Sequence, residues 1–107
     1  MARIEQLNTL LQQHINEIFV RDVEWPANSL ATIIKVSVSP DLSWADIAIS
    51  VLPINRGKAV LKKLNNQTRH IQHLLKQSVR LRKIPKLRWH LDDTELKNRR
   101  IERELAQ

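Results

Sequence analysis

Apolar residues recur at helical spacing near the start of the chain. They follow the i, i+3, i+4 pattern of an amphipathic helix at Ile4, Leu7, Leu11, Ile15, Ile18 and Phe19. We therefore predict a helix from about residue 3 to residue 21. A loop should follow it, because Pro26, Asn28 and Ser29 are residue types that favour turns.

Two segments with alternating apolar and polar residues come next, at 32–39 and 44–52. In the first segment, this alternation predicts one shared face for Thr32, Ile34, Val36 and Val38, and the opposite face for Ile33, Lys35, Ser37 and Ser39. In the second, it predicts a shared face for Ala45, Ile47, Ile49 and Val51. A short turn containing Pro40 and Asp41 joins the two segments, which indicates an antiparallel hairpin.

The period changes to that of a helix after Pro53. Helical spacing relates Val60, Leu61 and Leu64, and then Ile71, Leu74, Leu75, Ser78 and Val79. Asn65 and Asn66 lie between these two groups and have weak helix propensity, so we predict a break or kink there. Pro85 ends the helical pattern.

A third alternating segment, KLRWHL, occupies residues 86–91, with Leu87, Trp89 and Leu91 predicted to face inward. The predicted order is therefore α-β-β-α-α-β, an α+β fold with a three-stranded sheet covered on one face by helices. The last strand should run parallel to a neighbour. Thr94 is a candidate cap for a final helix, so we divide the chain into a domain at 1–93 and a helical tail at 94–107.

Composition excludes several classes of protein. The 107 residues contain no cysteine, which excludes disulfides and thiolate chemistry, and no apolar run approaches the roughly 20 residues that span a bilayer. The first residues lack the apolar segment of a signal peptide, so we expect a cytoplasmic protein. No phosphate-binding glycine loop or nucleophile constellation is present. We expect a monomeric non-enzyme without cofactor, metal or small-molecule substrate.

Charge is distributed unevenly along the chain. The net charge is +7, yet residues 1–55 carry three basic and six acidic side chains. Residues 56–91 carry eleven basic side chains and no acidic one. Surfaces that serve only solubility normally mix both signs, so this block favours a polyanionic partner.

The basic residues of this block also share a helical face. At about 100° per residue, a narrow stripe opposite the apolar positions contains Lys58, Lys62, Arg69, His73, Lys76, Arg80 and Lys83. Arg56, Lys63, Arg82, Lys86 and Arg88 would widen this surface. Cations in such a row can meet successive phosphates, so we predict that they bind nucleic acid.

Other interpretations of the same residues were weighed. The basic stripe is alternatively a solvated surface, or a face that binds an acidic protein. A base-stacking platform is not expected, because tyrosine is absent and only Trp44 should project from the outer face of the sheet. His70 and His73 are spaced for a shared metal ion, but no carboxylate or thiolate lies in their helix. His14 is more simply a packed histidine.

Three segments resemble the bacterial ribosome-binding factor A family. They are VSPDLSWADIAISVL (38–52), HIQHLLKQSVRLRKIPKLRWHLDDT (70–94) and, more loosely, the opening RIEQLNTLLQQHINEI. The resemblance implies a type II KH fold and a non-catalytic factor that binds the immature small (30S) ribosomal subunit. It further implies contact with 16S ribosomal RNA and a role in late RNA maturation, often during growth in the cold.

Two family motifs differ in this chain. An ordinary KH domain clamps single-stranded RNA with a GxxG loop, but the single glycine here, Gly57, lies ahead of that position. The family replaces the clamp with an Ala-x-Gly kink, and the matching positions are Gln67, Thr68 and Arg69. The family's Asp-Pro-Arg after the first helix is represented by Trp25, Pro26 and Ala27.

Overall fold

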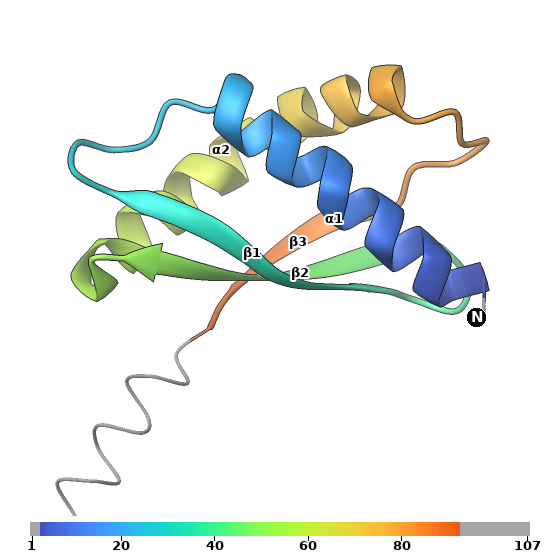
Figure 1. Ribbon diagram of the computed structural model, residues 1–107, viewed down its shortest axis with the longest axis horizontal. Coiled ribbons are helices and arrows are strands. Elements are labelled where there is room, and N and C mark those ends of the chain that lie inside the picture. The colour runs from blue at the N-terminus through green and yellow to red at the C-terminus, as the bar shows by residue number, and fades with distance from the viewer. Residues whose placement is uncertain (1–2, 93–107) are drawn as a thin grey trace, which may run out of the picture.

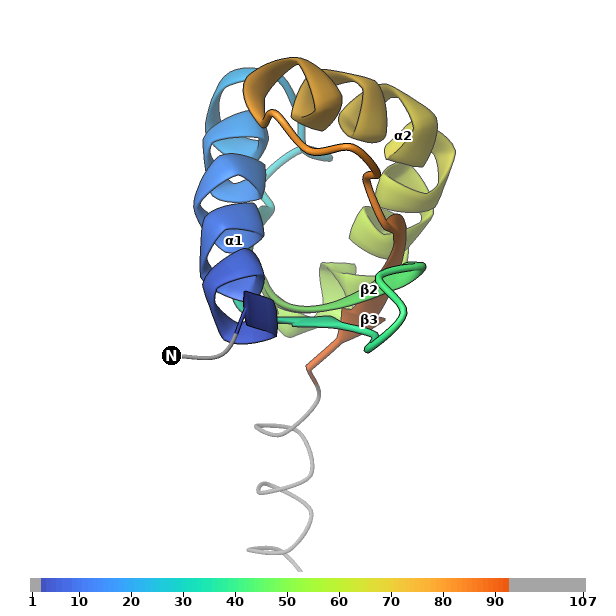
Figure 2. The same cartoon turned by 90° about the vertical axis from the view of Figure 1, so that its right-hand side faces the viewer.

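The computed structural model describes residues 3–92 of the chain. Its elements are α1 (Arg3–Arg21), β1 (Leu30–Val38), β2 (Trp44–Leu52), the short 3₁₀ helix η1 (Ile54–Arg56), α2 (Gly57–Ser78) and β3 (Lys86–Leu91). The sheet has the order β1-β2-β3, with β1 antiparallel and β3 parallel to β2. Both α1 and α2 cover the same face of this sheet (Figures 1 and 2). The predicted α+β architecture, hairpin and parallel last strand are confirmed.

The core lies between the sheet and the two helices. The central strand β2 contributes Ala45, Ile47 and Ile49, which are fully buried. The helices bury Leu11, Ile15, Val60, Leu64, Ile71 and Leu75 against them. Burial of each such aliphatic side chain stabilises the fold by about 1.5–3 kcal/mol. The orientation of both helices on the sheet is therefore the one that buries these residues. The predicted inward faces of β2 and β3 are confirmed.

The predicted alternation of β1 is wrong over its first half. Ala31 and Ile33 are buried, whereas Ile34 is 45% exposed. The pairing with β2 shifts between Ile33 and Lys35, which leaves Ile34 as an extra residue in a β-bulge. The bulge reverses the parity of the strand, so the buried positions are odd before it and even after it. The structural consequence is an isoleucine on the outer face of the sheet.

We predicted a break or kink at Asn65 and Asn66, and of these alternatives the break is wrong, because α2 is one helix from Gly57 to Ser78. Leu64 and Ile71 are both fully buried, and their packing outweighs the weak helix propensity of the two asparagines. The helix nevertheless changes direction along its length (Figures 1 and 2). The Thr68 hydroxyl donates to the Leu64 carbonyl at 2.8 Å, a contact that often bends helices.

Thr68 also ties α2 to the sheet. The Trp89 indole N–H of β3 donates to the Thr68 Oγ1 at 2.9 Å, and Trp89 is only 6% exposed. The Phe19 ring of α1 lies 5.6 Å from the Trp89 ring, measured between centroids. Thr68 occupies the centre of the positions that match the family's kink, and here it fixes the bent helix against β3.

The start of α2 and the end of β3 approach each other closely. A Cβ at Gly57 would lie 3.1 Å from the Leu91 Cδ1, so a larger residue here would require the Leu91 side chain to shift. The Asp92 N–H continues the pairing of β3 by donating to the Ile49 carbonyl at 2.7 Å. The predicted cap at Thr94 and the tail at 94–107 lie outside the described residues.

Candidate nucleic-acid interface

Five of the predicted binding residues lie on the exposed side of α2. They are Lys58, Lys62, Arg69, His73 and Lys76, and we call them the α2 ridge. At about 100° per residue they fall within about 60° of one another. The buried residues of the same helix, Val60, Leu64, Ile71 and Leu75, fall on the opposite side. The apolar packing of α2 on the sheet therefore determines which way its basic side chains point.

The helical stripe ends earlier than predicted. We expected Arg80 and Lys83 to continue it, but α2 ends at Ser78. Val79 has extended geometry, with φ −121° and ψ 126°, and its N–H donates to the Leu75 carbonyl at 2.9 Å. Arg80 and Lys83 are exposed in the connection to β3, where a helical projection no longer applies. Nothing in the sequence before Pro85 marks this end.

The same connection brings Arg82 to the ridge. A groove beside α2 is lined by Arg69, Gln72, His73, Lys76, Arg82 and Ile84. The Gln72 side chain donates to the Pro85 carbonyl at 3.1 Å and so holds the connection against the helix. Gln72 and Ile84 carry no charge, so the pattern of basic residues did not predict them. The position of Gln72 beside the stripe is the signal that would have identified it.

The ridge is not neutralised by carboxylates within residues 3–92. The ion pairs found there are Arg21 with Glu17, and Asp46 with Arg88 and His90. None involves a ridge residue or Arg82. Within this part of the chain the ridge keeps its positive charge, which is the electrostatic condition for backbone contacts to nucleic acid.

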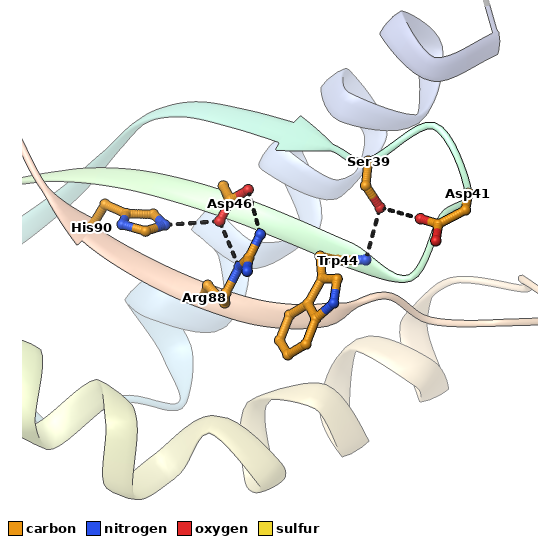
Figure 3. A network of polar contacts seen from close by, with 6 residues as sticks. All are labelled: Ser39, Asp41, Trp44, Asp46, Arg88 and His90. Atoms are coloured by element: carbon orange, nitrogen blue, oxygen red, sulfur yellow. Dashed lines mark hydrogen bonds and ion pairs between the residues drawn. The ribbon is translucent and has the colours of Figure 1, made fainter.

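Lys86 and Arg88 do not belong to this ridge. Both are exposed on β3, which buries Leu87 and Trp89 on its other face, and Figure 3 shows Arg88 beside Asp46. Arg88 forms two hydrogen bonds with Asp46, at 2.8 and 3.0 Å, and the His90 Nε2 lies 2.8 Å from the same carboxylate. Hydrogen bonds from Arg88 and then His90 hold the pKa of the Asp46 carboxyl below its ordinary value. Arg88 is thus already paired with Asp46, a residue that the pattern of basic residues did not indicate.

Other candidate sites were compared with the geometry. No cluster of three metal-ligating side chains occurs within residues 3–92, so His70 and His73 gain no third ligand there. His14 is half-buried, and its Nδ1 is buried with no hydrogen-bond partner. None of the helices in this part of the chain is long and apolar enough to cross a membrane.

Comparisons with known proteins agree with the arrangement of the domain. A crystal structure of ribosome-binding factor A from Thermus thermophilus superposes with a TM-score of 0.74 at 23% identity, covering 82% of this chain and 93% of that one. A Thermus thermophilus ribosome binding factor A homology model, fitted into a cryo-EM map of a 30S–RbfA complex, gives a TM-score of 0.71 at 23% identity. It covers 88% of this chain and 97% of that one. At this identity the superpositions establish the fold.

Sequence comparison establishes the family. Ribosome-binding factor A from Protochlamydia amoebophila is 35% identical over 104 residues, which cover 95% of this chain and 79% of the relative. Residues 3–105 match the sequence profile described as "Ribosome-binding factor A". The match extends over nearly the whole chain, and the three-stranded sheet with its two covering helices agrees with it. The chain therefore belongs to the ribosome-binding factor A family.

Proposed function

We propose that this chain is a non-catalytic assembly factor that binds the small (30S) ribosomal subunit in the cytoplasm. In this proposal the α2 ridge and Arg82 contact 16S ribosomal RNA, and binding assists late maturation of that RNA. Support comes from family membership and from the relative fitted into a 30S–RbfA complex. The observation that carries the choice of surface is a helix face whose exposed cations have no ion pair within residues 3–92 and whose direction is fixed by the core packing of α2.

The chemistry of the ridge favours contact with the RNA backbone. Lysine and arginine bind phosphates and position a protein, but phosphate contacts carry no sequence information. No phenylalanine, tyrosine or tryptophan belongs to the ridge or to the groove beside it, so base stacking there is limited to the His73 ring and the arginine guanidinium groups. We therefore expect the ridge to recognise the shape and charge of folded RNA.

Co-sedimentation with purified small subunits tests this proposal. Arg69→Glu combined with Lys76→Glu changes the charge in the C-terminal half of the ridge by four units. The matched control is Arg3→Glu combined with Arg21→Glu, which makes the same change in net charge on exposed positions of α1. We expect the ridge variant to lose most of its binding and the control to retain it.

Two results would contradict the assignment. Equal losses in the two variants would mean that net charge, not the ridge, determines binding. The second result has two parts: the ridge variant no longer binds the subunit, and the wild type does not bind protein-free 16S RNA. This result would instead favour an acidic protein as the partner. Circular dichroism of each variant establishes that its fold is intact.

A further inference from the structure

The outer face of the sheet carries a second group of exposed side chains, on the opposite side of the sheet from α2. Pairing of the strands determines its layout, because Trp44 lies opposite Lys86 and Asp46 opposite Arg88. Towards the other end of β2, the residues on this face are Ala48 and Ser50, which have small side chains. No helix within residues 3–92 covers this face (Figures 1 and 2).

One end of this face is an ordered aromatic and charged cluster. Trp44 is 36% exposed, and the Arg88 guanidinium carbon lies 4.4 Å from the centroid of its ring. Lys86 Nζ lies 5.6 Å from the same centroid. Asp46 holds Arg88 in place from the other side (Figure 3). These side chains are already fixed before any partner arrives, which lowers the entropic cost of binding.

The backbone under Trp44 is fixed as well. The Trp44 N–H donates to the Ser39 Oγ at 3.0 Å, and the Ser39 N–H donates to the Trp44 carbonyl at 2.8 Å. The Ser39 and Ser43 hydroxyls each donate to Asp41 at 2.7 Å. Hydrogen bonds from Ser43 and Ser39 lower the pKa of the Asp41 carboxyl to about 2. The turn therefore keeps its charged, hydrogen-bonded form at neutral pH.

The other end of the face is apolar. Leu30 and Leu52 lie directly opposite each other on β1 and β2, and each is 56% exposed. The bulge places Ile34, which is 45% exposed, further along the same face. Because of the bulge, the successive residues Ile34 and Lys35 are both exposed, so this part of β1 presents an apolar and a basic side chain side by side.

We propose that this outer sheet face is a docking surface for a protein component of the small ribosomal subunit, an inference that rests on the proposed function. The partner would present apolar side chains to Leu30, Ile34 and Leu52. Carboxylates at its edge would face Lys86 and Lys35, the cations of this face that have no ion pair within residues 3–92. Tryptophan and arginine, fixed here as Trp44 and Arg88, are the residue types that most often dominate protein–protein binding energy.

A protein partner fits this face better than RNA. Exposed leucine and isoleucine gain free energy by leaving water against apolar atoms, which a sugar–phosphate backbone does not offer. The charge of Arg88 is already neutralised by Asp46. The α2 ridge differs in carrying no exposed large apolar side chain, while its cations have no ion pair within residues 3–92. The two surfaces would let one small domain bridge RNA and protein.

Site-specific photo-crosslinking on purified small subunits tests the inference. The photoreactive residue p-benzoylphenylalanine replaces Ile34 or Thr32 on the outer face, or Asn65 on α2 beside the ridge; all three positions are exposed. After irradiation and denaturation, ribonuclease distinguishes adducts with RNA from adducts with protein. We expect the products at Ile34 and Thr32 to remain heavier than the free chain after ribonuclease. We expect the product at Asn65 to shrink to nearly the mass of the free chain, with only the crosslinked nucleotides still attached.

Each alternative outcome has a distinct meaning. An RNA adduct at Ile34 and Thr32 would overturn the inference by assigning the outer face to nucleic acid. No adduct at either position, with an RNA adduct at Asn65, would also overturn it while leaving the proposed function intact. If no position forms an adduct, Asn65 included, and the wild type does not co-sediment with the subunit, the proposed function itself would be contradicted.

Discussion

The hydrogen bond between Trp89 and Thr68 offers a sharp test of how α2 is fixed to the sheet. Thr68→Val keeps the shape of the side chain and replaces its hydroxyl by a methyl group. The substitution removes both the acceptor for the Trp89 N–H at 2.9 Å and the donor to the Leu64 carbonyl at 2.8 Å. Valine and threonine have similar helix propensities, so the change in intrinsic propensity is small.

The expected magnitude follows from the burial of Trp89. Its side chain is 6% exposed, so the indole N–H would lose its partner where water cannot easily replace it. Leaving a buried donor unsatisfied costs about 1–3 kcal/mol, and we expect Thr68→Val to lower the free energy of unfolding by that amount. For a domain of this size the melting temperature should fall by about 4–8 °C per kcal/mol.

Thr9→Val is the matched control for this measurement. The Thr9 hydroxyl donates to the Glu5 carbonyl at 3.1 Å, the same contact to the preceding turn, but on an exposed surface without a second partner. We expect this control to change the free energy of unfolding by less than about 0.5 kcal/mol. Urea unfolding followed by circular dichroism gives both values. Equal values for Thr68→Val and Thr9→Val would refute the role of the Trp89 contact.

Three further predictions concern the sheet. Ile47→Ala should lower the free energy of unfolding by about 2–5 kcal/mol in urea, whereas Ile34→Ala should change it by less than about 1 kcal/mol, since Ile47 is fully buried and Ile34 is not. NMR titration should place the pKa of the Asp41 carboxyl near 2. Because folding lowers this pKa from about 3.8, the carboxylate stabilises the fold above pH 3.8, and this stabilisation is lost as the pH falls towards 2. Ser43→Ala should raise that midpoint towards 3.8, and an unchanged midpoint would contradict the assigned cause. Asp46→Asn should change the free energy of unfolding by less than about 1 kcal/mol, because its ion pairs are largely exposed.

The limits of prediction from sequence are physical. The alternation of β2 is uninterrupted, so its buried face could be predicted directly. In β1 the neighbours Ile33 and Ile34 are both apolar, so the pattern permits either parity. The choice depends on pairing with β2, which is a tertiary interaction. The continuity of α2 through Asn65 and Asn66 likewise depends on packing of the residues around them.

The residues of the candidate site also divide into those that local periodicity predicts and those that depend on tertiary structure. Helical periodicity placed the ridge correctly between Lys58 and Lys76, because the buried face of α2 is determined by that period. It failed for Arg80 and Lys83, where the helix had already ended. The pairing of Arg88 with Asp46 requires the register of two parallel strands that lie far apart in the chain. Whether the ridge contacts RNA stays a prediction.

The salt dependence of binding to protein-free 16S RNA tests the central claim most directly. The ridge and Arg82 together carry five formal positive charges at neutral pH, from Lys58, Lys62, Arg69, Lys76 and Arg82. If each neutralises one phosphate, log K should fall with log salt concentration at a slope of roughly −4. The slope should weaken by about 2 for Arg69→Glu combined with Lys76→Glu and stay unchanged for Arg3→Glu combined with Arg21→Glu. A wild-type slope near zero, or equal slopes for both variants, would contradict binding through the α2 ridge.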